Sequence, residues 1–383
     1  MAIAPPVTAR WTDQKLIGKG FKQCGAFAFQ QNWFQLNIHW IILFTLLFFS
    51  LSGQASDKFS PHITANNVAV IVNSQDANSL VIGDYYMNAR NIPKKNLISV
   101  DIPAGVSTLT EAQFKTLRER IYSNIGEEIE VIVLTWTRPY AVHCNAITAA
   151  ITLGYQAKQC VNTCAAGMNN PYFNSQSRHP QKDFNMRLSI LLPTDSLEVA
   201  KNIIDKGVLS SFRVNDSTAY FLKTNDGTRS KPREQFFPKD LTKVESKKLW
   251  LRTIKADSIR DKKDVMFYFT GAISVPYLDT LNFMPGAVAD HLTSGGGVLV
   301  DGGQMSSLKW LEAGATGTYG SVSEPCNYWQ KFPNPAVLLI HYLAGETLIE
   351  AYWKSVYWPT QGLILGEPLA APYSTFNSLE TVN

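Results

Sequence analysis

VAVIVNSQDANSLVIGDYYMNARNIPKKNLISV, residues 68–100, decides the fold class, because two apolar runs flank a segment with helical spacing. The first run, VAVIVN at 68–73, is short, continuous and rich in Val and Ile, which is typical of a strand buried on both faces. Residues 80–91 repeat apolar side chains at helical intervals, and Pro93 ends that helix before a second strand at 97–102. This strand–helix–strand order predicts a right-handed crossover between parallel strands.

The same alternation continues along the chain. We expect strands near residues 129–136, 187–193, 218–225, 264–272, 296–302 and 362–368, and helices near 111–125, 196–211, 241–254, 304–315 and 336–356. The polar stretch 226–235 is interpreted as a loop, and the stretch 316–325 is rich in turn-forming residues. The sequence therefore predicts an α/β fold, with a mainly parallel sheet flanked by helices.

Residues 138–183 interrupt this alternation. They are rich in Asn, Gly, Ser and Cys, and only a short part of them has helical spacing. We interpret them as an irregular, Cys-containing insertion into the sheet. No long linker divides the remaining sequence, so we expect residues 56–383 to form a single α/β domain.

The first 55 residues have the features of an export signal. The apolar run at 40–51 has 12 residues, whereas a spanning helix needs roughly 20. Small residues follow this run, and cleavage after Ala55 would release the rest of the chain. An uncleaved short anchor is the alternative, and only in that case do we expect contact with a membrane. The prediction is an exported protein of the periplasm, the cell envelope or the medium.

The charge distribution argues against a nucleic-acid partner. The formal net charge is +4, and the first 55 residues hold four Lys and Arg against one Asp, which is +3. The remainder is therefore close to neutral and has no basic face. The GGG at 295–297 lacks the Lys-Ser/Thr that completes a phosphate-binding loop, and we expect no cofactor.

The cysteines favour a disulfide. Cys144, Cys160 and Cys164 lie within 21 residues, and in an oxidising compartment this clustering predicts a disulfide among the three. A zinc site that includes His143 is the alternative, but adjacent His and Cys are not usual ligand spacing, so we expect no metal. Cys326 is then either free or paired.

Several blocks resemble an uncharacterised family of exported bacterial proteins that co-occur with exosortase protein-sorting systems. These blocks are residues 70–100, 269–299, 314–335 and 345–373, which contain the motifs NSQDANSL, PGAVADHLTSGGG, GSVSEPCNYW and LILGEP. The resemblance implies export, with sorting-system or exopolysaccharide-associated envelope components as partners. It supplies no catalytic residues.

A weaker resemblance concerns the fold alone. A strand ending in Thr-Gly, the turn AGATGTYGS and a late GEP are similar to features of the gingipain-type cysteine peptidases, which have the caspase-haemoglobinase three-layer architecture. Such enzymes place His-Gly after the Thr-Gly strand end and Cys at the end of the next parallel strand. Here the two positions hold Ala272 and, if 296–302 is that strand, Gly302 and Gly303. The resemblance thus implies an inactive relative or a site rebuilt elsewhere.

A rebuilt site would use Cys326 as nucleophile and His291 as base. A thiol needs a neighbouring base, and the imidazole needs an orienting group; Asp301 is the preferred orienting residue, with Asp290 and Glu324 as alternatives. The opposing hypothesis is that His291 fixes a glycine corner and that Cys326 is a small buried side chain.

Ligand contacts are expected where strands end. Asn73 ends one predicted parallel strand and Arg138 follows another, so each could contact a ligand together with Glu324. The alternatives are that Asn73 caps the turn before the next helix and that Arg138 forms an ion pair with Glu324 or Glu367. The aromatic stretches NYWQKF and YWKSVYW could line a groove for sugars or peptides, with core packing as the alternative. We therefore expect a binding or accessory protein of the envelope, linked to exosortase-type sorting. A cysteine hydrolase and a glycan-binding module are the alternatives, so enzymatic activity stays undecided.

Overall fold

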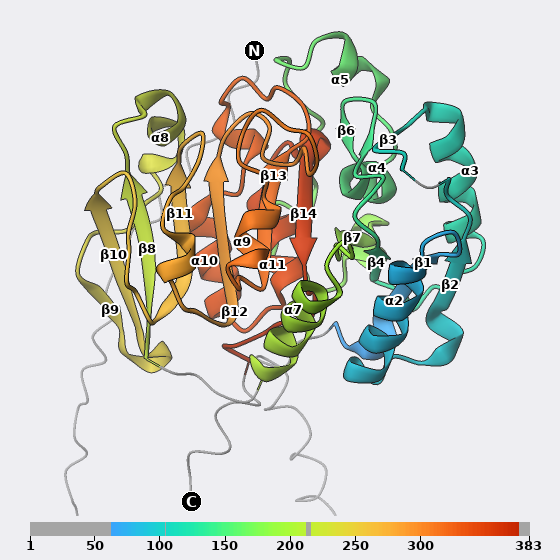
Figure 1. Ribbon diagram of the computed structural model, residues 1–383, viewed down its shortest axis with the longest axis horizontal. Coiled ribbons are helices and arrows are strands. Elements are labelled where there is room, and N and C mark those ends of the chain that lie inside the picture. Colours follow the sequence, from blue (N-terminus) through green and yellow to red (C-terminus); the bar gives the residue numbers. More distant parts are fainter. Residues whose placement is uncertain (1–62, 104, 212–215, 375–383) are drawn as a thin grey trace, which may run out of the picture. The chain divides into compact units, whose positions relative to one another are not determined.

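The structure is a computed structural model that describes residues 63–103, 105–211 and 216–374. The predicted signal segment, with its cleavage point, lies outside the described residues. Within them, eleven strands form one sheet in the order β2-β1-β4-β7-β14-β13-β12-β11-β8-β10-β9 (Figure 1). Three short strands form a second sheet in the order β3-β5-β6.

One half of the large sheet is parallel. β1 (Val68–Asn73) lies between β2 (Leu97–Val100) and β4 (Val131–Thr135), and β7 (Leu188–Leu191) pairs with β4. All six residues of β1 are buried, as expected for an apolar strand that is covered on both faces.

The other half is also parallel but runs in the opposite direction. Its neighbouring parallel strands are, in order, β13 (Gly317–Ser321), β12 (Phe283–Leu292), β11 (Val265–Gly271), β8 (Ser217–Lys223) and β10 (Leu249–Lys255). The short β9 (Thr242–Val244) pairs antiparallel with β10. β14 (Gly362–Gly366) joins the halves, because it is parallel to β7 and antiparallel to β13. The carboxyl ends of the two sets of strands therefore lie at opposite edges of the sheet.

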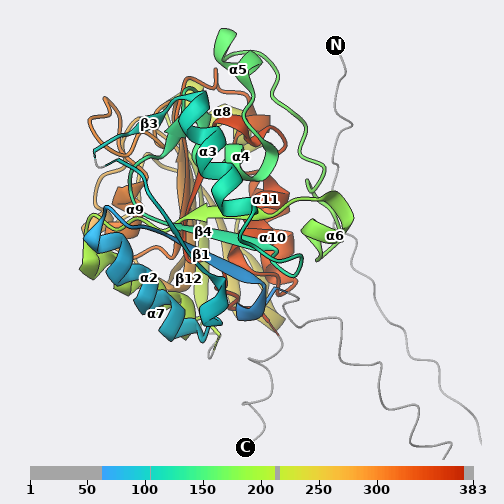
Figure 2. The same cartoon turned by 90° about the vertical axis from the view of Figure 1, so that its right-hand side faces the viewer.

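Helices cover both faces of the sheet (Figure 2). One face carries α2 (Ala77–Arg90), α7 (Leu197–Leu209) and α9 (Leu308–Glu312); the other carries α4 (Ile147–Leu153), α10 (Pro335–Leu343) and α11 (Leu348–Ser355). Every residue of α11 is buried. The predicted fold class, a mainly parallel sheet between layers of helices, is confirmed.

The predicted insertion lies between β4 and β7. Its elements besides α4 are β5 (Ala141–Val142), β6 (Asn145–Ala146), α5 (Ala157–Val161) and α6 (Pro180–Phe184). β5 pairs with β3 (Thr108–Leu109), which precedes α3 (Glu111–Tyr122). Among the described residues, short 3-10 helices lie at Ala65–Asn67, Lys94–Asn96, Glu245–Lys247, Leu278–Thr280, Trp329–Lys331 and Pro359–Gln361.

Two disulfides fasten the insertion. Cys144 pairs with Cys160, which confirms the disulfide predicted within the cysteine cluster. Cys164 pairs with Cys326, at a sequence separation of 162 residues. The second bond thus ties the insertion to the segment that follows β13.

The helix predicted for residues 241–254 is wrong, because this segment is the β9–β10 hairpin. Leu249 and Leu251 are buried, whereas Trp250 between them is 40% exposed. That alternation has the period of a half-buried strand.

Three further predictions need correction. Residues 226–235 are not a loop but contain α8 (Gly227–Glu234), which Asp226 caps by accepting the Arg229 N–H. The strand predicted at 296–302 is a series of turns, and the strands of this region are β12 and β13. The long helix predicted at 336–356 is divided into α10 and α11 around Gly345, which has a φ of +86°.

Candidate functional site

The glycine run after β12 packs against β13 at backbone distance. A Cβ on Gly297 would lie 2.6 Å from the carbonyl oxygen of Gly320. The Gly297 N–H donates to the Ser321 carbonyl at 2.8 Å. A side chain at position 297 would break this approach, so the turn requires glycine.

His291 is buried near the end of β12, and both of its ring nitrogens have partners. Nδ1 accepts a hydrogen bond from the Trp310 indole N–H at 2.9 Å, and Nε2 lies 3.1 Å from the Met305 carbonyl oxygen. Because an indole only donates and a carbonyl only accepts, the proton resides on Nε2 and the ring is neutral. Burial lowers the pKa of His291 to about 4.

Asp290 does not orient His291. Successive residues of a strand point to opposite faces, and the Asp290 carboxylate pairs with Arg233 at 2.6 Å, where both side chains are 1% exposed. Arg233 belongs to α8 and also donates to the Thr270 carbonyl at 2.7 Å. Burial raises the pKa of Asp290 to about 6, although the Arg233 charge opposes the shift.

The structure does not bring the proposed catalytic residues together. Cys326 is bonded to Cys164 and therefore has no free thiol, and the lone pair of His291 Nδ1 is used by Trp310. Asp301 is exposed. The pKa of Tyr140 is raised mainly by burial of that side chain, and the negative charge of Asp301 adds to the increase.

The strand ends also differ from those expected of a peptidase. Ala272 follows β11, as the sequence showed. The next parallel strand is β12, which ends at Leu292, so Gly302 and Gly303 are not at a strand end. Neither strand end carries a Cys nucleophile.

The residues proposed to contact ligands have structural partners. The Asn73 side chain accepts from the Ile102 N–H and donates to the Ile102 carbonyl, both at 3.0 Å. Arg138 pairs with Asp195 at 3.8 Å, not with Glu324. Glu324 instead accepts the backbone N–H of Cys326 at 2.7 Å.

The two aromatic stretches singled out from the sequence do meet. The ring centroids of Tyr328 and Trp358 lie 6.0 Å apart, and those of Trp358 and Tyr357 lie 5.9 Å apart. The series continues from Tyr357 to Phe173 of the insertion at 5.2 Å. All of these rings are at least partly exposed, and Tyr328 is 46% exposed. They are therefore accessible to a ligand, in contrast to the core tryptophans.

A groove of about 450 Å³ adjoins Tyr328, the first ring of this series, between α8 and residues 327–330. We call it the α8 groove; its lining includes Thr228, Lys231, Gln235, Asn327, Tyr328 and Trp329. Asn327 Oδ1 and Gln330 Oε1 are buried and make no hydrogen bond within the described chain. Buried oxygens of this kind usually have a partner, so the wall of the groove holds two acceptors that lack one among the described residues.

Contacts from the insertion hold the wall of this groove. Besides the Cys164–Cys326 bond, Lys331 Nζ donates to the Thr163 carbonyl at 2.5 Å. Burial lowers the pKa of Lys331 to about 8. Gln361 donates to the Glu324 carbonyl at 2.9 Å. The loop that carries Tyr328 is thus held by two contacts from the insertion and one from Gln361.

The sequence pointed to the aromatic side of the α8 groove but not to the helical side. The sequence does contain a signal for α8: Asp226 is a favourable N-cap residue, and the oppositely charged Arg229 follows three residues later. In the structure these two side chains form an ion pair at 2.8 Å. Pro232 within the helix obscured that signal.

No protein-family model matches the sequence, and no curated protein matches it. Comparison with solved structures finds a chain described as "Structure of Protease", at 12% sequence identity and a TM-score of 0.45. The similarity covers 82% of this chain and 80% of that chain. A similarity of this degree assigns no activity.

Within residues 63–103, 105–211 and 216–374, no three His, Cys, Asp or Glu side chains are grouped so as to hold a metal ion. The helices of the same described segments include none that is both long and apolar enough to span a membrane.

Proposed function

We propose that this protein is an exported binding protein whose α8 groove holds an oligosaccharide of the cell envelope. The observation that carries the proposal is the meeting of two aromatic stretches, residues 328–329 and 357–358, beside unused amide oxygens.

The chemistry of the groove suits a sugar. A sugar ring has an apolar face of C–H groups, and the partly exposed aromatic rings offer flat surfaces for it. Its hydroxyls both donate and accept, and the side-chain amides of Gln235, Asn327 and Gln330 do the same. A peptide that binds as an added strand needs an open strand edge, and none of the nine lining residues belongs to a strand.

The charge of the groove favours an acidic sugar. Lys231 is exposed, and the other eight residues that line the groove are uncharged. The lining therefore contains a positive charge and no carboxylate. A uronic acid or a pyruvylated sugar would therefore bind more tightly than its neutral counterpart. Because the cation is exposed, the preference should weaken as salt is added.

The test is a titration with acidic and neutral oligosaccharides, followed by tryptophan fluorescence and calorimetry. We expect Tyr328→Ala and Trp329→Ala to weaken binding about tenfold or more, since each removes a contact surface of a large aromatic ring. Trp250→Ala is the matched control, because Trp250 is also exposed, at 40%, but lies on β10. Equal losses in all three variants, or no binding of any oligosaccharide, would contradict the proposal.

A place in exosortase-type sorting is a further part of the proposal, and it is supported by the sequence blocks 70–100, 269–299, 314–335 and 345–373 alone. The two disulfides agree with an oxidising compartment. Deleting the gene should reduce delivery of a sorted reporter to the cell surface. Unchanged delivery, with the glycan binding intact, would remove the sorting role and leave the binding function.

A further inference from the structure

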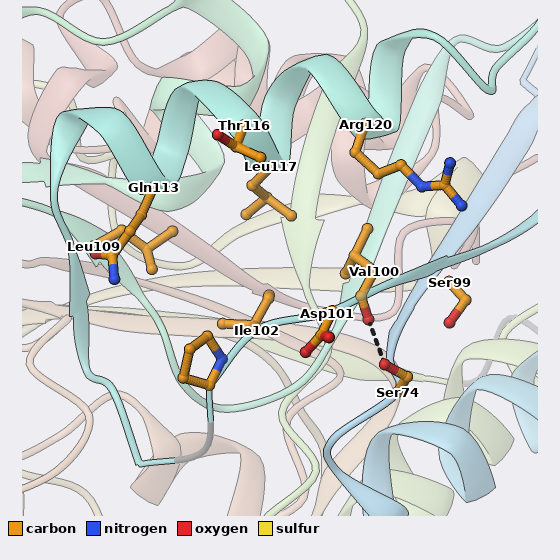
Figure 3. A pocket seen from close by; sticks show the side chains of 11 residues that line it. Ser74, Ser99, Val100, Asp101, Ile102, Leu109, Gln113, Thr116, Leu117 and Arg120 are labelled. Carbon is orange, nitrogen blue, oxygen red and sulfur yellow. Dashed lines mark hydrogen bonds between the residues drawn. The ribbon is translucent and has the colours of Figure 1, made fainter.

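A second pocket lies between α3 and the carboxyl ends of β1 and β2, with a volume of about 610 Å³ (Figure 3). β2 and β1 come first in the strand order of the large sheet, whereas β11 and β8, which α8 contacts, stand near the other end of that order. Its volume is in the range of pockets that hold small organic molecules. The α8 groove and this pocket share no residue.

The helical wall of this pocket is one face of α3. Gln113, Thr116, Leu117 and Arg120 line it, and their spacing of three and four residues brings them to the same side of the helix. Figure 3 shows Gln113 and Arg120 towards opposite ends of the wall, with Leu117 between them.

The opposite wall is held by hydrogen bonds from the end of β1. The Asn73 amide fixes Ile102 through both its backbone groups. The next residue, Ser74, donates to the Val100 carbonyl through its backbone N–H at 2.8 Å and its hydroxyl at 3.1 Å. The pocket is therefore preformed, and Asn73, proposed from the sequence as a ligand contact, positions its wall instead.

The interior of the pocket is apolar. Val100, Ile102, Leu109 and Leu117 are between 2% and 6% exposed and come from both walls. Pro103 adds a further apolar surface. An apolar body of a ligand would thus replace water next to these side chains.

Two opposite charges lie in the pocket without partners. Arg120 lies on the α3 wall and Asp101 on the other wall (Figure 3). Among the described residues, neither side chain makes an ion pair or a hydrogen bond, either with the other or with a third group. An anionic amphiphile would be attracted by Arg120 but repelled by Asp101, and a cationic amphiphile would be attracted by Asp101 but repelled by Arg120. A zwitterion can place a charge of opposite sign next to each side chain.

We propose that this pocket binds a short apolar peptide, a di- or tripeptide, with its carboxylate at Arg120 and its ammonium at Asp101. Apolar side chains of the peptide lie against Leu109 and Leu117. The hydroxyl of Ser99, which also lines the pocket, is available to the peptide bond. The site is independent of the glycan site proposed above.

The experiment is calorimetry with Leu-Leu, its N-acetyl form and its C-terminal amide. Each lost charge contact should weaken binding of Leu-Leu about tenfold. Arg120→Gln should have that effect on Leu-Leu but leave the affinity for the amide unchanged. Asp101→Asn should weaken Leu-Leu but not the N-acetyl form. Lys115→Gln is the control, because Lys115 is an exposed cation of α3 that does not line the pocket.

Three results would overturn the proposal. The first is no binding of Leu-Leu at millimolar concentration. The second is a loss that Lys115→Gln shares with Arg120→Gln, which would mean a general effect of charge. The third is tight binding of decanoate that Asp101→Asn strengthens, which would identify an anionic amphiphile as the ligand. Both charged residues are exposed, so their substitution leaves the fold intact.

Discussion

Hydrogen-bond capacity decides what His291 does in this protein. Its neutral ring accepts from Trp310 and donates to the Met305 carbonyl, so no lone pair is left for a thiol proton. The pair Asp290–His291 suggested a catalytic carboxylate and imidazole. The sequence could not show that Arg233 and Trp310, far away along the chain, are the partners of these two side chains.

The buried imidazole makes stability depend on pH. Its pKa is about 4 in the folded protein and 6.5 when unperturbed, so between these values the unfolded state binds more protons. The stabilising contribution is present above pH 6.5 and is lost as the pH falls towards 4. We expect the stability advantage of the wild type over His291→Gln to shrink by roughly 3 kcal/mol from pH 7 to pH 4.

Denaturant unfolding of both proteins across this pH range measures the effect. Asp290, with its pKa raised to about 6, contributes a trend of opposite sign: its stabilisation is present below pH 3.8 and is lost as the pH rises through 6. That contribution is present in both proteins and cancels in the difference, as long as the substitution leaves Asp290 unaffected. A difference that does not change with pH would show that His291 is not buried as a neutral ring.

At the scale of elements, most continuous apolar runs were predicted correctly, whereas the mixed strands β10, β12 and β13 were not. β1, β4 and β11 are apolar throughout or nearly so, and their positions follow from the sequence. β12 contains Asp290 and His291, and β13 has the sequence GTYGS. Such residues enter a buried strand only because neighbours from elsewhere in the chain satisfy or cover them. That information is not present within a single stretch.

The contact of the glycine turn with β13 gives a prediction at this scale. Gly297→Ala should lower the free energy of unfolding by about 1–3 kcal/mol, because the new Cβ would lie 2.6 Å from the backbone of Gly320. Gly303→Ala is the matched control in the same loop, since a Cβ there meets nothing within 4 Å. Thermal or chemical unfolding compares the two; equal effects would mean that the turn moves away from β13 without cost.

For the whole molecule, the alternation of strand and helix patterns predicted the fold class, and the cysteine cluster predicted one disulfide. The aromatic stretches predicted one side of the α8 groove. The second disulfide was not predictable, because it joins segments that lie far apart in sequence, and Pro232 obscured the N-cap signal of α8. The groove exists only once the insertion, α8 and residues 326–330 have been brought together.

The Cys164–Cys326 bond should therefore support binding as well as stability. The double variant Cys164→Ser/Cys326→Ser should lose about 2–5 kcal/mol of unfolding free energy and bind oligosaccharide more weakly. The pair Cys144 and Cys160 is the control, since its bond spans 16 residues and lies away from the groove lining. Replacing it should affect stability more than glycan affinity.

Alkylation of the mature wild-type protein, located by mass mapping, checks the same bonds. No thiol among Cys144, Cys160, Cys164 and Cys326 should react before reduction. A Cys326 that reacts rapidly near neutral pH, and more slowly in His291→Ala, would instead revive the cysteine-hydrolase hypothesis.

The position of β14 has a consequence for how the chain matures. It is the last strand in sequence among the described residues, yet it lies between β7 and β13 in the sheet. Until residues 362–366 have been synthesised, those two strands have open edges that invite wrong pairing. The two halves are joined only once residues 362–366 have been synthesised. A protein of this topology depends on being kept apart from its copies until that strand has emerged.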